Sequence, residues 1–221
     1  MGLPVLLLGE SGSGKTYSIK NFEPNEVGIF SVEKNRLPFK KKFNVAKNAT
    51  YERITNVLLH KDKEGNIAPA LKSYVIDDSQ YLLVNELFDR ASETGYKKFT
   101  DMAVHFRNLI KNITKYLPDD VIVYFLHHPE VDSNTGHFKA KTVGRMLDEK
   151  LTLEGCFDIV LFAQIDNGKH IFVTQSDGSI PAKSPEDMFE TKIPNDLKAV
   201  DTAIRDYYDM KPNKTEGNKE D

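Results

Sequence analysis

The sequence predicts an α/β fold in which a mostly parallel sheet with five core strands is flanked by helices. Short apolar segments alternate along the chain with amphipathic ones. The apolar segments are typical of strands buried on both faces of a sheet, and the amphipathic segments are typical of the helices that cover it. The 221 residues are enough for one such domain with a sizeable core. After the fifth core strand, a turn and one more strand-like segment predict a C-terminal β-hairpin extension.

Five segments rich in Val, Ile, Leu or Phe are expected to form the core strands: Pro4–Leu8, Glu26–Val32, Ser73–Ile76, Val121–Leu126 and Asp158–Ala163. Segments with apolar residues at helical spacing lie between them: Tyr51–Leu59, Tyr81–Ala91 and Phe99–Tyr116. The hairpin is expected from the turn Asp166-Asn167-Gly168 and the strand His170–Thr174, and a last helix from Leu197–Met210. We therefore expect one domain over residues 1–210 and a disordered polar tail over residues 211–221.

The composition excludes several classes of protein. A net charge of −3 provides no global basic field that would attract nucleic acid, so any such binding requires a local patch. The single cysteine, Cys156, cannot form a disulfide within the chain, which suits the reducing cytoplasm. Neither a signal peptide nor an apolar segment of membrane-spanning length is recognisable, so we expect no membrane association.

The first predicted strand leads into a complete phosphate-binding motif of the form G-x-x-x-x-G-K-[ST]. It reads Gly9-Glu10-Ser11-Gly12-Ser13-Gly14-Lys15-Thr16, and a helical segment, Thr16–Asn21, follows it. Glycines let the backbone turn so that several N–H groups converge on an anion. Lys15 is expected to meet the β- and γ-phosphates, and the Thr16 hydroxyl to bind Mg²⁺, which takes hard oxygen ligands. The motif, with Tyr17 directly after it, predicts a site for ATP and Mg²⁺.

Three carboxylates follow predicted strands and are candidates for metal binding or for activating water. Asp77 follows Ser73–Ile76 and is expected to hold Mg²⁺, directly or through water. Asp78 is either a second acidic group at the nucleotide or the cap of the next helix. Glu33 follows the second strand, at the sheet edge where α/β proteins bind ligands. The sequence leaves open whether Glu33 or Asp78 activates water.

The order of these features resembles that of the RecA-like ATPases. A phosphate-binding loop is followed by a strand ending in an acidic residue, an Asp-bearing strand, a long helix and a strand with a polar end. The resemblance implies a RecA-like fold in which Glu33 is the catalytic base. It also implies that His127 or His128 contacts the γ-phosphate, with His128 the candidate for a catalytic role.

Later segments resemble a narrower family, the small phage-encoded RecA-like ATP-binding proteins associated with phage recombination and single-strand annealing. These segments are Val75–Leu82, Leu126–His128, Lys141–Leu147, Leu153–Phe157, Ala182–Pro185 and Ile193–Leu197. The resemblance implies a Mg²⁺-dependent ATPase of DNA recombination or replication that engages single-stranded DNA. Such an ATPase is expected to hydrolyse ATP slowly in the absence of DNA or of a partner such as a single-strand-binding or replication protein. The alternative is a nucleotide-dependent switch or loader that acts on a protein partner; a metabolite kinase is disfavoured, because the six arginines form no lid cluster.

Two segments are expected to contact DNA, because basic residues beside an aromatic ring suit the phosphates and bases of a single strand. The candidates are Lys97 and Lys98 in the first, and Phe138, Lys139, Lys141 and Arg145 in the second. The alternative is that both are ordinary solvated loops. Lys183 is expected either to reach the γ-phosphate of a neighbouring copy in a homo-oligomer or to lie in a surface turn.

Overall fold

The apolar segments of the chain pair into a large central sheet, which we describe from a computed structural model covering residues 1–33, 36–143 and 152–211. Its strands are β1 (Leu3–Gly9), β2 (Val27–Ser31), β3 (Val45–Lys47), β4 (Ser73–Asp77), β5 (Ile122–His127), β8 (Ile159–Asp166), β9 (Lys169–Val173) and β10 (Lys192–Pro194). They lie in the order β10-β9-β8-β1-β5-β4-β2-β3, and a separate hairpin pairs β6 (Pro129–Val131) with β7 (Phe138–Ala140).

Strand direction divides the sheet into two parts. From β8 to β3, neighbouring strands run parallel, whereas β9 and β10 are antiparallel additions at one edge. Every residue of β1, β4 and β5 is buried, because helices cover both faces of the sheet at its centre. The fold is thus mixed α/β with a large, mostly parallel sheet, as the alternation of segments predicts.

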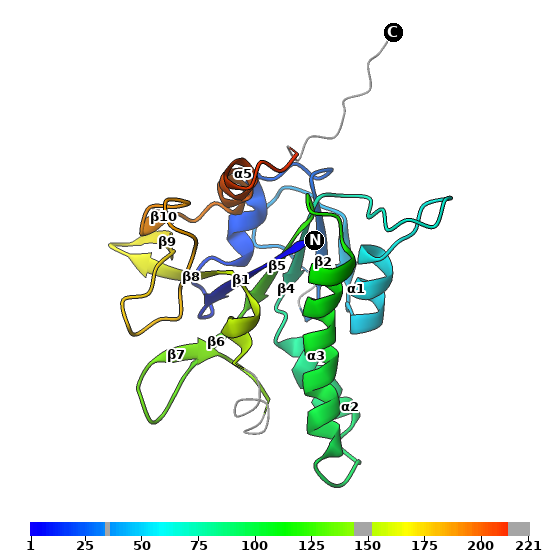
Figure 1. Cartoon of the computed structure of the whole chain (residues 1–221). Helices are drawn as coiled ribbons and strands as arrows, with labels where there is room; N and C mark the ends of the chain where they lie inside the picture. The colour runs from blue at the N-terminus through cyan, green and yellow to red at the C-terminus, as the bar shows by residue number, and fades with distance from the viewer. Residues whose placement is uncertain (34–35, 144–151, 212–221) are drawn as a thin grey trace.

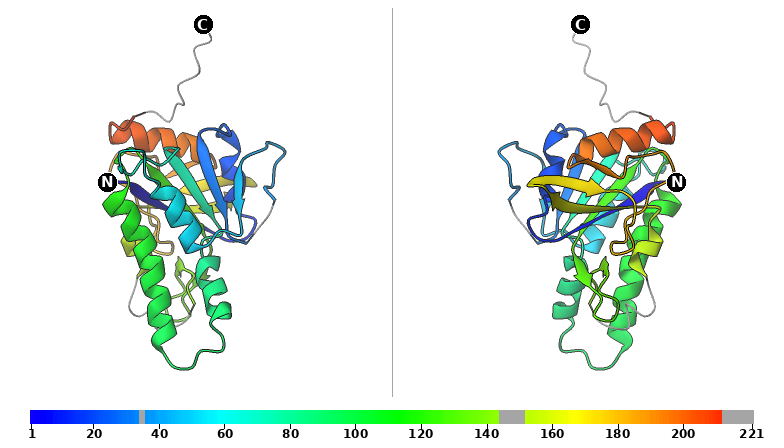
Figure 2. Two further views of the ribbon diagram at one scale, coloured as in Figure 1. Left: turned by 90° about the vertical axis from the view of Figure 1, so that its right-hand side faces the viewer. Right: turned by 90° about the vertical axis from the view of Figure 1, so that its left-hand side faces the viewer.

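Helices form a layer on each face of this sheet (Figures 1 and 2). On one face lie α1 (Tyr51–Leu58), α2 (Tyr81–Asp89), α3 (Lys97–Tyr116) and the 3₁₀ helix η2 (Leu153–Cys156); on the other lie the 3₁₀ helix η1 (Thr16–Asn21) and α5 (Leu197–Tyr207). The predicted apolar stripe of α3 is buried against the sheet: Met102, Phe106, Leu109, Ile110 and Ile113. The α2–α3 pair extends past the sheet, so its far end stands away from the core (Figure 2).

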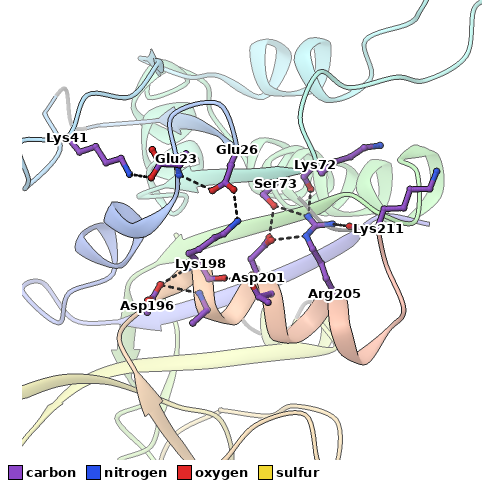
Figure 3. Close-up of polar contacts among 12 residues, drawn as sticks. Glu23, Glu26, Lys41, Lys72, Ser73, Asp196, Lys198, Asp201, Arg205 and Lys211 are labelled. Atoms are coloured by element: carbon purple, nitrogen blue, oxygen red, sulfur yellow. Dashed lines mark hydrogen bonds and ion pairs between the residues drawn. The ribbon is translucent and has the colours of Figure 1, made fainter. Parts of the chain in front are cut away.

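A buried polar cluster fastens α5 to the amino-terminal ends of the central strands (Figure 3). Arg205 Nε donates to Asp201 Oδ2 at 2.7 Å, and the guanidinium also donates to the Asp120 and Lys72 carbonyls and to Ser73 Oγ. Asp201 Oδ1 accepts from Ser73 Oγ at 2.5 Å and from the Tyr124 hydroxyl at 3.0 Å. Because these charges are paired and hydrogen-bonded, they can be buried without a large desolvation penalty.

The structure differs from the sequence-based expectation where elements are short. Strands β3, β6, β7 and β10 have three residues each, too few for a recognisable alternation. The segment after the glycine-rich loop is 3₁₀ rather than α, with the Phe22 N–H donating to the Ile19 carbonyl. Lys211, predicted in the tail, accepts a hydrogen bond from Arg205, while residues 212–221 lie outside the described part of the chain. Among the described residues, no helix combines the length and apolar character needed to cross a bilayer.

Candidate functional site

The glycine-rich loop joins β1 to η1 at the carboxyl edge of the sheet. Strand β1 lies between β8 and β5, with Leu8 opposite His127 and Gly9 opposite Ala163. Strand β4 is the next neighbour of β5, and past its end the Ser79 N–H donates to the Leu126 carbonyl at 2.9 Å. The residues that follow β1, β4 and β5 are therefore brought together, as ligand-binding residues are in parallel α/β sheets.

Two glycines of the loop adopt backbone conformations that other residues rarely take. Gly12 has φ 83° and Gly14 has φ 97°, both in the left-handed region. A Cβ added to Gly14 would lie 3.0 Å from His170 Nδ1 and 3.1 Å from Asn195 Nδ2, so a side chain there would also require these neighbours to move. The loop also receives a hydrogen bond from outside, because the His170 ring donates from Nδ1 to the Ser13 carbonyl at 3.0 Å.

Lys15 is folded back over its own loop. Its ammonium donates to the Gly9 carbonyl at 2.5 Å and to the Glu10 carbonyl at 3.1 Å, and the residue is only 6% exposed. A phosphate entering the loop would offer this cation oxygens with a full negative charge in place of neutral carbonyls. The attraction between two opposite full charges, strengthened by the burial of Lys15, favours that exchange.

Thr16 and Asp77 meet at the edge of the loop although they are far apart in the sequence. The Thr16 hydroxyl donates to Asp77 Oδ1 at 2.9 Å, and Oδ2 lies 3.2 Å away. Within the described residues, no group of three or more His, Cys, Asp or Glu side chains could hold a metal. Such a sparse donor set fits Mg²⁺, which is usually held by one or two carboxylates together with substrate phosphates and water.

A cavity of about 360 Å³ opens over the loop, within the usual size range for small-molecule sites. Eight of the predicted nucleotide-site residues line it: Glu10, Ser11, Gly12, Gly14, Lys15, Thr16, Tyr17 and His128. Its lining also includes Arg36, Pro38 and His170, which the sequence did not indicate. The cationic Lys15 and Arg36 outnumber the single acid, Glu10, so the cavity suits an anion although the chain as a whole is negative.

The residues that the sequence missed reach the cavity through long-range packing. The chain after β2 folds back toward η1, and the Phe39 ring meets the Tyr17 ring edge-on at 6.3 Å, which brings Arg36 and Pro38 over the loop. His170 reaches it because β9 pairs antiparallel with β8. The predicted hairpin was the only sequence signal for His170, and no local pattern indicates Arg36.

The two consecutive histidines after β5 have different surroundings. His127 is fully buried; its Nε2–H donates to the Lys141 carbonyl at 2.7 Å, and its Nδ1 lies 2.9 Å from the Ser79 hydroxyl. Burial lowers the pKa of His127 from 6.5 to about 4, so the ring is neutral at pH 7. His128 is the one that lines the cavity, and its Nε2 lies 3.4 Å from Asp78 Oδ1.

The two candidates for activating water are also separated by the fold. Asp78 is buried, adopts a left-handed φ of 60°, and lies next to both Asp77 and His128. Glu33 is exposed and lines a different cavity with Tyr51 and Glu86 on the α1–α2 side. The structure therefore places Asp78 next to His128, a residue that lines the cavity over the glycine-rich loop, and places Glu33 at another cavity.

Most of the predicted DNA-contacting residues have partners within the chain. Lys97 pairs with Asp101 at 2.8 Å, Lys98 donates to the Arg90 and Glu93 carbonyls, and Lys139 lies 3.2 Å from Glu130. The Phe138 ring packs on Phe162 with centroids 5.1 Å apart, which limits base stacking. Of the second loop, Lys141 is exposed, while Arg145 lies outside the described residues.

Lys183 is exposed but is not among the described residues that line the cavity. Its N–H and carbonyl both bond to Val160, each at 2.8 Å, which fixes it beside the start of β8. This position is that of a surface residue; whether it acts on a neighbouring copy stays a prediction.

Comparison with known proteins adds no relative. No protein-family model matches the sequence, and no curated protein matches it.

Proposed function

We propose that this protein binds ATP with Mg²⁺ in the cavity over the glycine-rich loop and hydrolyses it. The observation that carries the proposal is the 2.9 Å contact between Thr16 and Asp77 beside the folded-back Lys15. The Thr16 hydroxyl, directly after Lys15 in the sequence, meets the Asp77 carboxylate from a distant strand, which is the arrangement that a triphosphate and its metal need. The strand–loop–helix context is also the one that the phosphate-binding motif requires.

Each residue has a role that its position supports. Lys15 exchanges its loop carbonyls for the β- and γ-phosphate oxygens, and the left-handed conformations of Gly12 and Gly14 let the loop backbone turn its N–H groups toward the phosphates. Thr16 and Asp77 are the residues that would hold Mg²⁺. When bound, the metal supplies charge neutralisation for the transferring phosphoryl group.

Water is oriented by the pair of Asp78 and His128 in this proposal. His128 lines the cavity, so its ring can contact a water placed for attack on the γ-phosphate. Asp78, 3.4 Å from the His128 Nε2, acts through the ring as a positioning residue. Glu33, the base implied by the RecA-like resemblance, lines another cavity and has no role in this arrangement.

The wider role that we propose follows from the resemblance to phage recombination proteins: an ATPase that engages single-stranded DNA. A nucleotide-dependent switch acting on a protein is the second candidate. One contact is compatible with both candidate roles: His127, at the end of β5, donates a hydrogen bond to the carbonyl of Lys141, which directly follows the β6–β7 hairpin. A movement of His128 on nucleotide binding would therefore shift the neighbouring His127 and, through this hydrogen bond, the hairpin. The hairpin could then contact DNA or a protein partner.

The central test is ATP binding by the Lys15→Ala variant. Loss of charge-assisted contacts worth about 3 kcal/mol weakens binding by about 100-fold. Titration calorimetry measures the affinity, and circular dichroism checks that the variant is folded. The matched control is Lys47→Ala, an exposed cation on β3. If Lys15→Ala binds ATP as tightly as the control does, the proposal is wrong.

A further inference from the structure

The outer face of α3 carries a row of cations without local acids. Residues 102–118 contain no Asp or Glu, although acidic residues outnumber basic ones in the whole chain. Arg107, Lys111 and Lys115 follow one another at intervals of four, so they lie on the same side of the helix about 6 Å apart along its axis. All three are exposed, opposite the buried apolar stripe.

The row differs from the other basic groups of the same helix. At the amino-terminal end of α3, Lys97 is paired with Asp101, which also contacts Arg90 at the end of α2. In the part of the chain that the structure describes, no carboxylate lies within ion-pair distance of Arg107, Lys111 or Lys115. Their charge is therefore available to an external anion.

These three residues form one exposed row along α3. We call Arg107, Lys111 and Lys115 the α3 basic stripe.

An exposed aromatic ring lies at one end of the stripe. Tyr116 is 46% exposed, and Lys115 Nζ lies 4.8 Å from the centre of its ring. A row of cations with an adjacent accessible ring matches the two requirements of single-stranded nucleic acid, which are charge for the phosphates and a surface for a base. A nucleic acid supplies, beside each phosphate, a flat base that can stack on such a ring.

We propose that the α3 basic stripe binds the phosphates of single-stranded nucleic acid, with a base stacked on Tyr116. The inference rests on the DNA-engaging part of the proposed function, but it needs no nucleotide in the cavity. It places the strand away from the segments containing Lys97, Lys98 and Lys139, whose charges are already engaged.

Two triple variants with the same loss of charge test this inference. The first combines Arg107→Gln, Lys111→Gln and Lys115→Gln. The control combines Lys97→Gln, Lys98→Gln and Lys139→Gln, which removes lysines that already have partners. Binding of fluorescent oligothymidine is measured by anisotropy between about 50 and about 200 mM salt. ATP affinity is measured on the same samples.

Each phosphate contact contributes about 0.7 to the slope of log K against log salt for a single strand. The stripe variant should lose about 2 from that slope, and the control variant less than about 0.7. Tyr116→Ala should weaken binding with the slope unchanged, because stacking involves no counterions. ATP affinity should stay at the wild-type value in all three proteins.

Several outcomes would overturn the inference. One is a stripe variant with the wild-type slope, and another is a control variant that loses as much as the stripe variant does. Equal binding of polyglutamate would instead indicate a site for acidic proteins. Wild-type protein that binds ATP in a Lys15-dependent way but not oligothymidine would refute the stripe and leave the ATP site standing. Wild-type protein that binds oligothymidine but not ATP would refute the ATP site and leave the stripe standing.

Discussion

His127 should make the stability of this protein depend on pH in a defined range. Its ring is fully buried and neutral, and burial lowers its pKa from 6.5 to about 4. Between those values the unfolded chain binds a proton that the folded protein excludes, so stability falls as the pH falls. About 1.4 kcal/mol per pH unit over this interval amounts to roughly 3 kcal/mol, fully present above pH 6.5 and lost by about pH 4.

The measurement is urea unfolding of the wild type and of His127→Gln at a series of pH values. The variant is less stable at pH 7, because it loses the buried contacts to Ser79 and Lys141. Its stability should nevertheless fall less on acidification than that of the wild type, by roughly 3 kcal/mol. The control, His137→Gln, changes an exposed histidine and should follow the wild-type curve. Parallel curves for the wild type and His127→Gln would refute the reasoning.

Three further predictions concern the site and the core. Asp78→Asn should slow ATP hydrolysis by about 100-fold with ATP affinity retained, whereas Glu33→Gln should hydrolyse ATP normally; a steady-state phosphate-release assay decides, and the reverse result would restore Glu33 as the base. Asp77→Asn should raise the Mg²⁺ concentration needed for half-maximal activity, because one metal ligand loses its charge; an unchanged Mg²⁺ titration would exclude Asp77 as a ligand. Arg205→Ala should lower the free energy of unfolding by about 3–5 kcal/mol, since it leaves the Asp201 carboxylate buried without its cation; urea unfolding measures this, and a loss below about 1 kcal/mol would contradict it.

The core of the fold could be predicted because its signals are local. Strands such as β1 and β5 are continuous apolar runs, and the α3 stripe repeats at helical spacing, so each reveals its own environment. The glycine-rich loop could be recognised for a similar reason, since its function depends on backbone conformations that only glycine adopts readily. Three-residue strands and the 3₁₀ form of η1 carry no such signal and depend on neighbours distant in the sequence.

By itself, the sequence determined the alternating α/β architecture, the loop, and the pairing of Thr16 and Asp77 as candidate metal ligands. Tertiary structure alone decided which of His127 and His128 lines the cavity and whether Asp78 or Glu33 contacts a lining residue. It also brought Arg36 and His170 to the loop. The physical reason is that a sequence specifies the chemistry of each side chain, whereas its direction and its partners depend on strand pairing and packing across the whole chain.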